Sequence, residues 1–90
     1  MTSPVHRPEA HCFEAIVDGH TGRVEYSVRD DVMTIVHTEV DPALEGRGVA
    51  GALVQAALDH ARSHGLKVTP RCAYAASYMD RHPESRALRP

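Results

Sequence analysis

Residues 36–51 read Val-His-Thr-Glu-Val-Asp-Pro-Ala-Leu-Glu-Gly-Arg-Gly-Val-Ala-Gly, and this stretch decides the fold. It begins as a β-branched strand, which Asp41-Pro42 ends because proline cannot donate to a ladder. A glycine-containing turn follows, and from Gly48 to His64 the apolar residues recur with a helical period. The first N–H groups of a helix have no internal partner and lie at the positive end of its dipole, so the turn is a predicted anion site.

The glycines of the turn indicate a phosphate-bearing ligand, because they let a bulky phosphate approach backbone N–H groups without meeting a Cβ. No Gly-Lys-Ser/Thr follows, which excludes a P-loop. Gly46, Gly48 and Gly51 have the G-x-G-x-x-G spacing, but 90 residues of this pattern cannot build the parallel doubly wound sheet of a dinucleotide-binding fold. The alternative is a loop and helix start that binds nothing.

Strand-like and helix-like segments flank this stretch. Short turns at 18–22 and 30–31 join three alternating segments into an antiparallel meander. After the helix, Gly65 suits the C′ position, and a short β-branched segment returns as a β-α-β crossover does. The prediction is an α/β (α+β) fold with an antiparallel three-stranded meander, a central helix, a fourth strand parallel to its neighbour and a short C-terminal helix. The predicted strands are 11–17, 23–29, 32–40 and 66–69, and the predicted helices are 48–64 and 73–81.

Length and composition predict one small domain, with residues 1–10 as a flexible lead-in and 11–90 as the folded unit. A formal net charge of −2 argues against nucleic-acid binding, which needs a basic face. No apolar run is long enough to span a membrane. Two cysteines and no apolar leader predict a cytoplasmic protein with reduced thiols. The seven histidines show no zinc-site spacing, so no metal is expected, and we expect a monomer or weak homodimer.

Three segments together resemble the minimal GNAT-like N-acetyltransferase family of small acetyl-CoA-binding proteins: 36–40, 45–50 and 68–74. Gly48 and Ala50 match the last two specified positions of the family's acyl-CoA motif, Gln/Arg-x-x-Gly-x-Gly/Ala. Glu45 departs from the first position, and Arg47 within the turn is a basic residue that can reach phosphate oxygens instead. The closing His82-Pro83-Glu84 is similar to the tail of that family, so the resemblance covers roughly residues 11–84.

The resemblance implies acetyl-CoA as cofactor and an amine on a small molecule or protein as acceptor. In that family the strand before the turn bulges and splays, and its backbone pairs with the pantetheine amides. The residues implied in cofactor binding are Thr38, Glu39, Val40, Glu45, Gly46, Arg47, Gly48, Val49, Ala50 and Gly51. The alternative function is a non-catalytic acyl-CoA-binding or protein-interaction module.

Two residues are candidates for catalysis. Cys72 follows the fourth strand, and the resemblance implies an acetyl-accepting nucleophile there; Arg71 and the following helix N-terminus would lower its pKa. His37 matches the family's His-Thr pair, which places it near Cys72 as base or orienter. The alternatives are a packing cysteine and a satisfied sheet histidine. Tyr74 and Tyr78 either protonate the leaving thiolate or, as we favour, pack.

Overall fold

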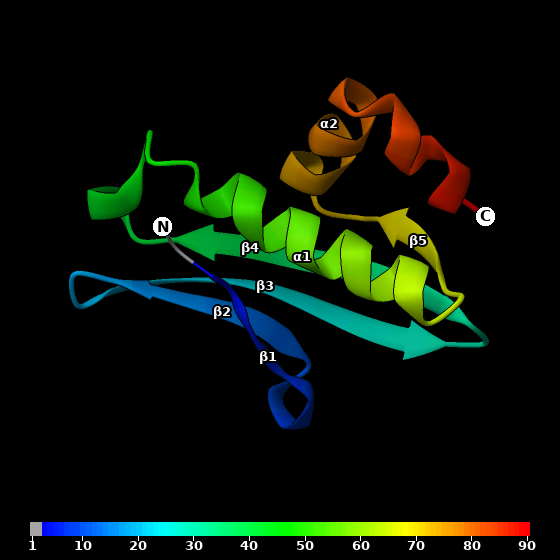
Figure 1. The fold of residues 1–90 in the computed structure, drawn as a ribbon, viewed down its shortest axis with the longest axis horizontal. Helices are drawn as coiled ribbons and strands as arrows, with labels where there is room; N and C mark the ends of the chain where they lie inside the picture. Colours follow the sequence, from blue (N-terminus) through cyan, green and yellow to red (C-terminus); the bar gives the residue numbers. More distant parts are fainter. Residues whose placement is uncertain (1–2) are drawn as a thin grey trace.

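A computed structural model describes residues 3–90 as one five-stranded sheet with helices packed against it. The strand order is β1-β2-β3-β4-β5. Helix α1 crosses one face of the sheet, and α2 lies next to α1 on the side of β5 (Figure 1). The elements are β1 (Val5–Arg7), η1 (Pro8–Ala10), β2 (Cys12–Val17), β3 (His20–Arg29), β4 (Val32–Val40), η2 (Pro42–Leu44), α1 (Val49–Ser63), β5 (Lys67–Pro70), α2 (Ala73–Arg81) and η3 (Pro83–Leu88).

The predicted meander and crossover are confirmed. β2, β3 and β4 pair antiparallel in sequence order, and β5 pairs parallel to β4 after α1. The turn between β2 and β3 is shorter than expected, since only Asp18 and Gly19 lie outside the strands. Both have positive φ, 51° and 78°, as a two-residue turn needs to match the twist of its flanking strands.

The N-terminal segment differs from the flexible lead-in expected for residues 1–10. β1 is an edge strand that pairs antiparallel with β2, with His6 opposite Phe13. The His6 ring stacks on Phe13 with centroids 4.3 Å apart, and its Nε2 forms a 2.5 Å hydrogen bond with the Tyr26 hydroxyl. The contacts of a single histidine in a three-residue strand leave no periodic signal, so the sequence did not reveal this strand. Met1 and Thr2 lie outside the described residues, and the division of the chain into domains stays a prediction.

β4 bulges and then parts from β5. The β3–β4 register shifts between Glu25, opposite His37, and Tyr26, opposite Ile35, so Val36 is an extra residue in β4. The pairing of β4 with β5 ends at Ile35, whose carbonyl accepts from the N–H groups of both Arg71 (3.0 Å) and Cys72 (3.2 Å). Beyond the bulge β4 pairs only with β3, so within residues 3–90 its edge toward β5 is open from Val36 to Val40.

The core lies between α1 and the sheet. Six residues of α1 are buried there, and they form the apolar stripe expected from the sequence: Val49, Leu53, Val54, Ala57, Leu58 and Ala61. The start of α1 can approach β3 because Gly22 has no side chain. A Cβ at Gly22 would lie 3.2 Å from side-chain carbons of both Val40 and Val49. This close approach fixes the first turn of α1 against the end of β4.

The C-terminal tail packs on α2 instead of trailing from it. Leu88 in η3 is buried, and the buried Ser85 hydroxyl donates to the carbonyls of Met79 (3.2 Å) and His82 (2.7 Å). None of the helices within residues 3–90 is long and apolar enough to cross a membrane.

Candidate functional site

The glycine turn is held in a conformation that only glycine adopts readily. The Asp41 carboxylate accepts from the Ala43 N–H at 2.9 Å and so caps η2. That bond, followed by the one with His20, lowers the pKa of Asp41. Gly46 and Gly48 then both take φ of +77°, in the left-handed region. These two left-handed residues turn the chain from the end of β4 into α1.

The turn leaves backbone donors free. The first hydrogen bond of α1 runs from the Ala52 N–H to the Gly48 carbonyl at 3.0 Å. Among residues 3–90 no acceptor pairs with the N–H groups of Val49, Ala50 or Gly51. A Cβ built at Gly46 or Gly48 meets nothing within 4 Å, so the space above the turn is open. Free donors, an open approach and a helix N-terminus together fit a phosphate group.

A hollow of about 330 Å³ lies beside these donors, and we call it the glycine-turn hollow. It extends from the end of β4 across the glycine turn to Tyr74 in the first turn of α2. Its lining residues are Val40, Leu44, Glu45, Gly46, Gly48, Val49, Ala50, Gly51 and Tyr74.

Most of the residues that the sequence implicated in cofactor binding are brought together in this hollow. Three are not in its lining. Arg47 turns away, and its guanidinium lies 3.3 Å from the Asp18 carboxylate. Thr38 and Glu39 lie on the open edge of β4, where their backbone atoms remain available. The side chain of Glu39 is exposed on the other face of the sheet, beside His37.

Cys72 lies where β5 parts from β4. It is the N-cap residue of α2, and its Sγ donates to the Thr38 hydroxyl at 3.4 Å. Burial, the largest influence, disfavours the thiolate. The Thr38 hydroxyl and the N–H groups of Ala75 and Tyr74 outweigh burial, so the pKa of Cys72 is lowered. Cys12 is the contrast: burial, reinforced by Glu14, raises the pKa of its thiol. Only Cys72 has the lowered pKa that a nucleophilic thiol needs.

His37 is not brought to Cys72. It lies opposite Glu25 in the β3–β4 register, and its Nε2 is 3.4 Å from the Glu39 carboxylate. Successive side chains of a strand point to opposite faces, so His37 lies across the sheet from Thr38, which contacts Cys72. The expected His37–Cys72 pair is therefore absent among the described contacts. The bulge at Val36 sets which residues face inward, and a register shift of this kind is not readable from alternation alone.

The side chain of Thr38 is the partner that sequence reasoning missed, since it implicated only the backbone there. No signal in the sequence identifies it, because counting by twos from the core residue Ile35 and counting by twos from Val40 place Thr38 on opposite faces of the sheet.

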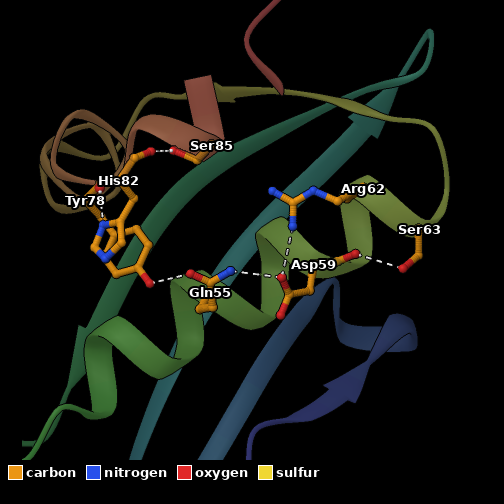
Figure 2. A network of polar contacts seen from close by, with 7 residues as sticks. All are labelled: Gln55, Asp59, Arg62, Ser63, Tyr78, His82 and Ser85. Atoms are coloured by element: carbon orange, nitrogen blue, oxygen red, sulfur yellow. Dashed lines mark hydrogen bonds and ion pairs between the residues drawn. The ribbon is translucent and has the colours of Figure 1, made fainter. Parts of the chain in front are cut away.

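Tyr78 packs, as the sequence favoured, and it ties α2 to α1. Its hydroxyl donates to Gln55 Oε1 at 2.5 Å, and Gln55 in turn donates to Asp59 at 2.9 Å (Figure 2). The His82 ring stacks on Tyr78 with centroids 3.9 Å apart. Burial first, and then nearby Tyr74, raises the pKa of Tyr78 and keeps it a neutral donor. The first turn of α2, with Cys72 and Tyr74, is thus held at a fixed position over α1.

These features define the class of domain: a small α+β fold with a bulged strand, a splayed parallel neighbour and a glycine turn opening the helix between them. Comparison with known proteins leads to the same class of domain. The profile of the family described as GCN5-related N-acetyl-transferase matches residues 12–88, and the chain belongs to this family.

Curated relatives match over a shorter stretch. Protein NATD1 of chicken and of mouse are each 38% identical over 52 residues, which cover 58% of this chain and 47% of theirs. The human Protein NATD1 is equally similar, with 46% of its length covered. The chain therefore spans about half the length of these relatives. The family assignment does not favour the alternative function, a non-catalytic acyl-CoA-binding or protein-interaction module.

Proposed function

We propose that this protein binds acetyl-CoA at the glycine turn and transfers the acetyl group to an amine acceptor. One observation carries the proposal: the free N–H groups of α1 and the open edge of β4 flank the same hollow, and the Cys72 thiol lies beside that edge. Family membership supports the reaction class.

The residues present fit acetyl-CoA. The N–H groups of Val49, Ala50 and Gly51 are the donors for its pyrophosphate, and the open edge of β4 from Thr38 to Val40 offers backbone groups to the pantetheine amides. Glu45 in the lining is the one group that opposes a phosphate by charge. Binding at the turn therefore depends on neutral N–H donors and the dipole of α1, and we expect it to be moderate in strength.

Two chemical routes follow from this arrangement. In the direct route, the amine attacks the acetyl group of the bound thioester and Cys72 stays unmodified. In the route through Cys72, which we favour, the Sγ thiolate forms a bond to the acetyl carbonyl carbon as the carbon–sulfur bond to CoA breaks. The departing CoA thiolate takes a proton from the hydroxyl of Tyr74, which solvent replaces. The amine then attacks acetyl-Cys72, loses a proton to water, and expels the Cys72 thiolate.

The lowered pKa of Cys72 supports the second route, because more thiolate is present near neutral pH. Thr38 has a positioning role in this scheme: its hydroxyl fixes the sulfur at the splay and stabilises the thiolate. Tyr74 is the better proton donor of the two tyrosines, since it lines the hollow and Tyr78 is engaged with Gln55.

The test is intact-mass measurement after incubation with acetyl-CoA, without and then with a panel of primary amines. The wild type and Cys12→Ser should gain one acetyl group, and Cys72→Ser should gain none while binding acetyl-CoA as before. Cys12 is the matched control, as a buried cysteine whose pKa is raised. Acetylated amine without an acetyl-enzyme would establish the direct route. No transfer to any amine and no acetyl-enzyme would contradict the proposed function.

A further inference from the structure

Three histidines form a continuous line of rings from β1 to the C-terminal end of α1, and we call them the histidine cluster: His6, His60 and His64. The rings of His6 and His60 lie 4.5 Å apart, and those of His60 and His64 lie 4.0 Å apart, measured between centroids. His6 and His60 are half-buried, and His64 is exposed. The cluster lies at the opposite end of α1 from the glycine turn, and the proposed function does not use it.

β1 is attached to the rest of the fold mainly through His6. The strand has three residues and pairs only with β2. His6 stacks on Phe13, contacts the edge of His60, and shares a hydrogen bond with the Tyr26 hydroxyl. The other side-chain contact is a largely exposed ion pair from Arg7 to Glu14, 3.6 Å long, which contributes little to stability. A short edge strand held in this way opens more easily than the whole domain.

Protonation of the histidine cluster places like charges against one another. Within residues 3–90 no carboxylate pairs with any of the three rings, since the histidines that do form such pairs are His20 and His37. The other titratable groups near the cluster are the Tyr26 hydroxyl from β3, the His11 ring from the end of η1, and Glu9 and Cys12, which act on Tyr26. None of these groups is a carboxylate in contact with an imidazolium, so the charges are not neutralised.

The docked position of β1 therefore opposes protonation of His60. Burial, followed by His64 and His6, lowers the pKa of His60. Departure of β1 removes His6 and part of the burial, so the released state binds the proton more tightly than the docked state. By linkage, a falling pH favours release of β1.

β1 lies close to the glycine turn at one end and covers a thiol at the other. Ser3, two residues before the strand, lines a hollow of about 570 Å³ together with Arg47 and Gly48 of the turn. Arg7, the last residue of β1, lies opposite Cys12, which is only 6% exposed. Release of β1 thus frees one flank of the glycine turn and uncovers Cys12.

We propose that the histidine cluster makes β1 an acid-released strap: when the cluster is protonated, β1 leaves β2 and α1 while the rest of the fold stays intact. The neutral cluster holds the strap in place near pH 7.5, through the ring stack with Phe13 and the hydrogen bond with Tyr26. This device goes beyond the proposed function and does not depend on it, since no step of it involves acetyl-CoA.

The experiment measures how fast 4,4′-dithiodipyridine modifies Cys12 in a Cys72→Ser background at pH 7.5, 6.5 and 5.5. The rate at each pH is divided by the rate for the same chain unfolded in urea, which cancels the effect of pH on the thiol itself. The normalised rate then reports the population in which β1 is released. It should rise about tenfold from pH 7.5 to 5.5, since one unit of difference in pKa between two states changes their ratio tenfold.

Two variants test the role of the cluster. His60→Phe keeps an aromatic ring against His6 and Phe13 but cannot bind a proton, so most of the rise should disappear. His64→Gln removes a charge beside His60 without removing a contact of β1, and it should also reduce the rise. His20→Gln is the matched control, because His20 is an exposed histidine that pairs with Asp41 outside the cluster. This variant should keep the full rise.

Circular dichroism at each pH distinguishes release of β1 from unfolding of the whole domain. The helical signal should stay unchanged at pH 5.5 while the normalised rate rises. A normalised rate that stays flat across pH in the parent chain would overturn the proposal. An equal rise in His60→Phe and His64→Gln, or a rise that parallels loss of the helical signal, would overturn it as well.

Discussion

The Cys72 thiol donates to the Thr38 hydroxyl across 3.4 Å, and this contact bridges the two strands at the point where they part. Thr38 belongs to the free edge of β4, and Cys72, two residues after the end of β5, is the N-cap residue of α2. This hydrogen bond thus links the open edge of β4, where we propose that the pantetheine of acetyl-CoA lies, to Cys72, the candidate nucleophile.

Thr38→Val should raise the pKa of Cys72. The valine keeps the shape of threonine but removes the hydroxyl that favours the thiolate against the opposing effect of burial. The rate of alkylation by iodoacetamide, measured across pH in a Cys12→Ser background, gives the pKa. The alkylation midpoint should move to higher pH in Thr38→Val and stay in place in Thr38→Ser. An unchanged midpoint in the valine variant would show that backbone N–H groups, those of Ala75, Tyr74 and Thr38, lower the pKa without the hydroxyl.

Tyr78→Phe should lower the free energy of unfolding by about 1 kcal/mol, because it removes the donor to Gln55 and leaves a partly buried amide oxygen unpaired. Urea unfolding followed by circular dichroism measures this loss. Tyr74→Phe is the comparison, since no hydrogen bond of the Tyr74 hydroxyl is seen within residues 3–90. An equal loss in both variants would mean that the Gln55 bond contributes nothing specific.

The protein should lose stability as the pH falls through 6.5. Burial, followed by the neighbouring His64 and His6, lowers the pKa of His60 below its ordinary value of 6.5. The unfolded chain therefore binds a proton that the folded His60 resists, and the free energy of unfolding decreases with falling pH. The loss begins near the unfolded pKa and levels off below the folded one.

Urea midpoints at pH 7.5, 6.5 and 5.5 test this expectation, with His60→Gln as the comparison. The His60 ring lies 4.5 Å from that of His6 and 5.6 Å from that of Phe13, measured between centroids. The glutamine variant loses these contacts and should therefore be less stable at pH 7.5. Its free energy of unfolding should also depend less on pH. A pH slope that survives the substitution would assign the effect to other groups.

Gly51→Ala should separate stability from ligand binding. Alanine favours the helix over glycine by up to about 1 kcal/mol, and a Cβ at this position meets the Tyr74 hydroxyl at 3.4 Å, an ordinary contact. The added methyl group nevertheless enters the lining of the glycine-turn hollow. We expect an unchanged or higher urea midpoint together with several-fold weaker acetyl-CoA binding. Weaker binding with a lower midpoint would point to misfolding of the first turn instead.

Much of the fold was readable from the sequence because its signals are local. The stripe from Val49 to Ala61 and the alternation of β3 and β4 gave elements whose bounds differ from the observed ones by only a few residues. The edge strand β1 was not readable, because it depends on His6 contacting Phe13 and Tyr26 across the sheet. Such contacts have no trace in a three-residue pattern.

The candidate site was readable in part for the same reason. The glycine turn is a local motif, and its unpaired N–H groups lie at the start of α1, where the sequence predicted them. The hydrogen-bond partner of Cys72 was not readable from the sequence. The bulge at Val36 reverses the face of the sheet on which each later side chain of β4 lies. The diversion of Arg47 to Asp18 depends on a turn 29 positions away in the chain.

The most direct test of the account is calorimetric titration of acetyl-CoA into the wild type, Gly48→Ala and Gly65→Ala. Gly48 and Gly65 have φ of +77° and +69° with open space around each, so alanine carries a similar backbone strain at both. Only Gly48 lies at the turn. We predict saturable one-site binding to the wild type and Gly65→Ala, and binding at least tenfold weaker to Gly48→Ala. No binding to the wild type at millimolar acetyl-CoA, or equal binding to both variants, would contradict the central claim that this turn holds the cofactor.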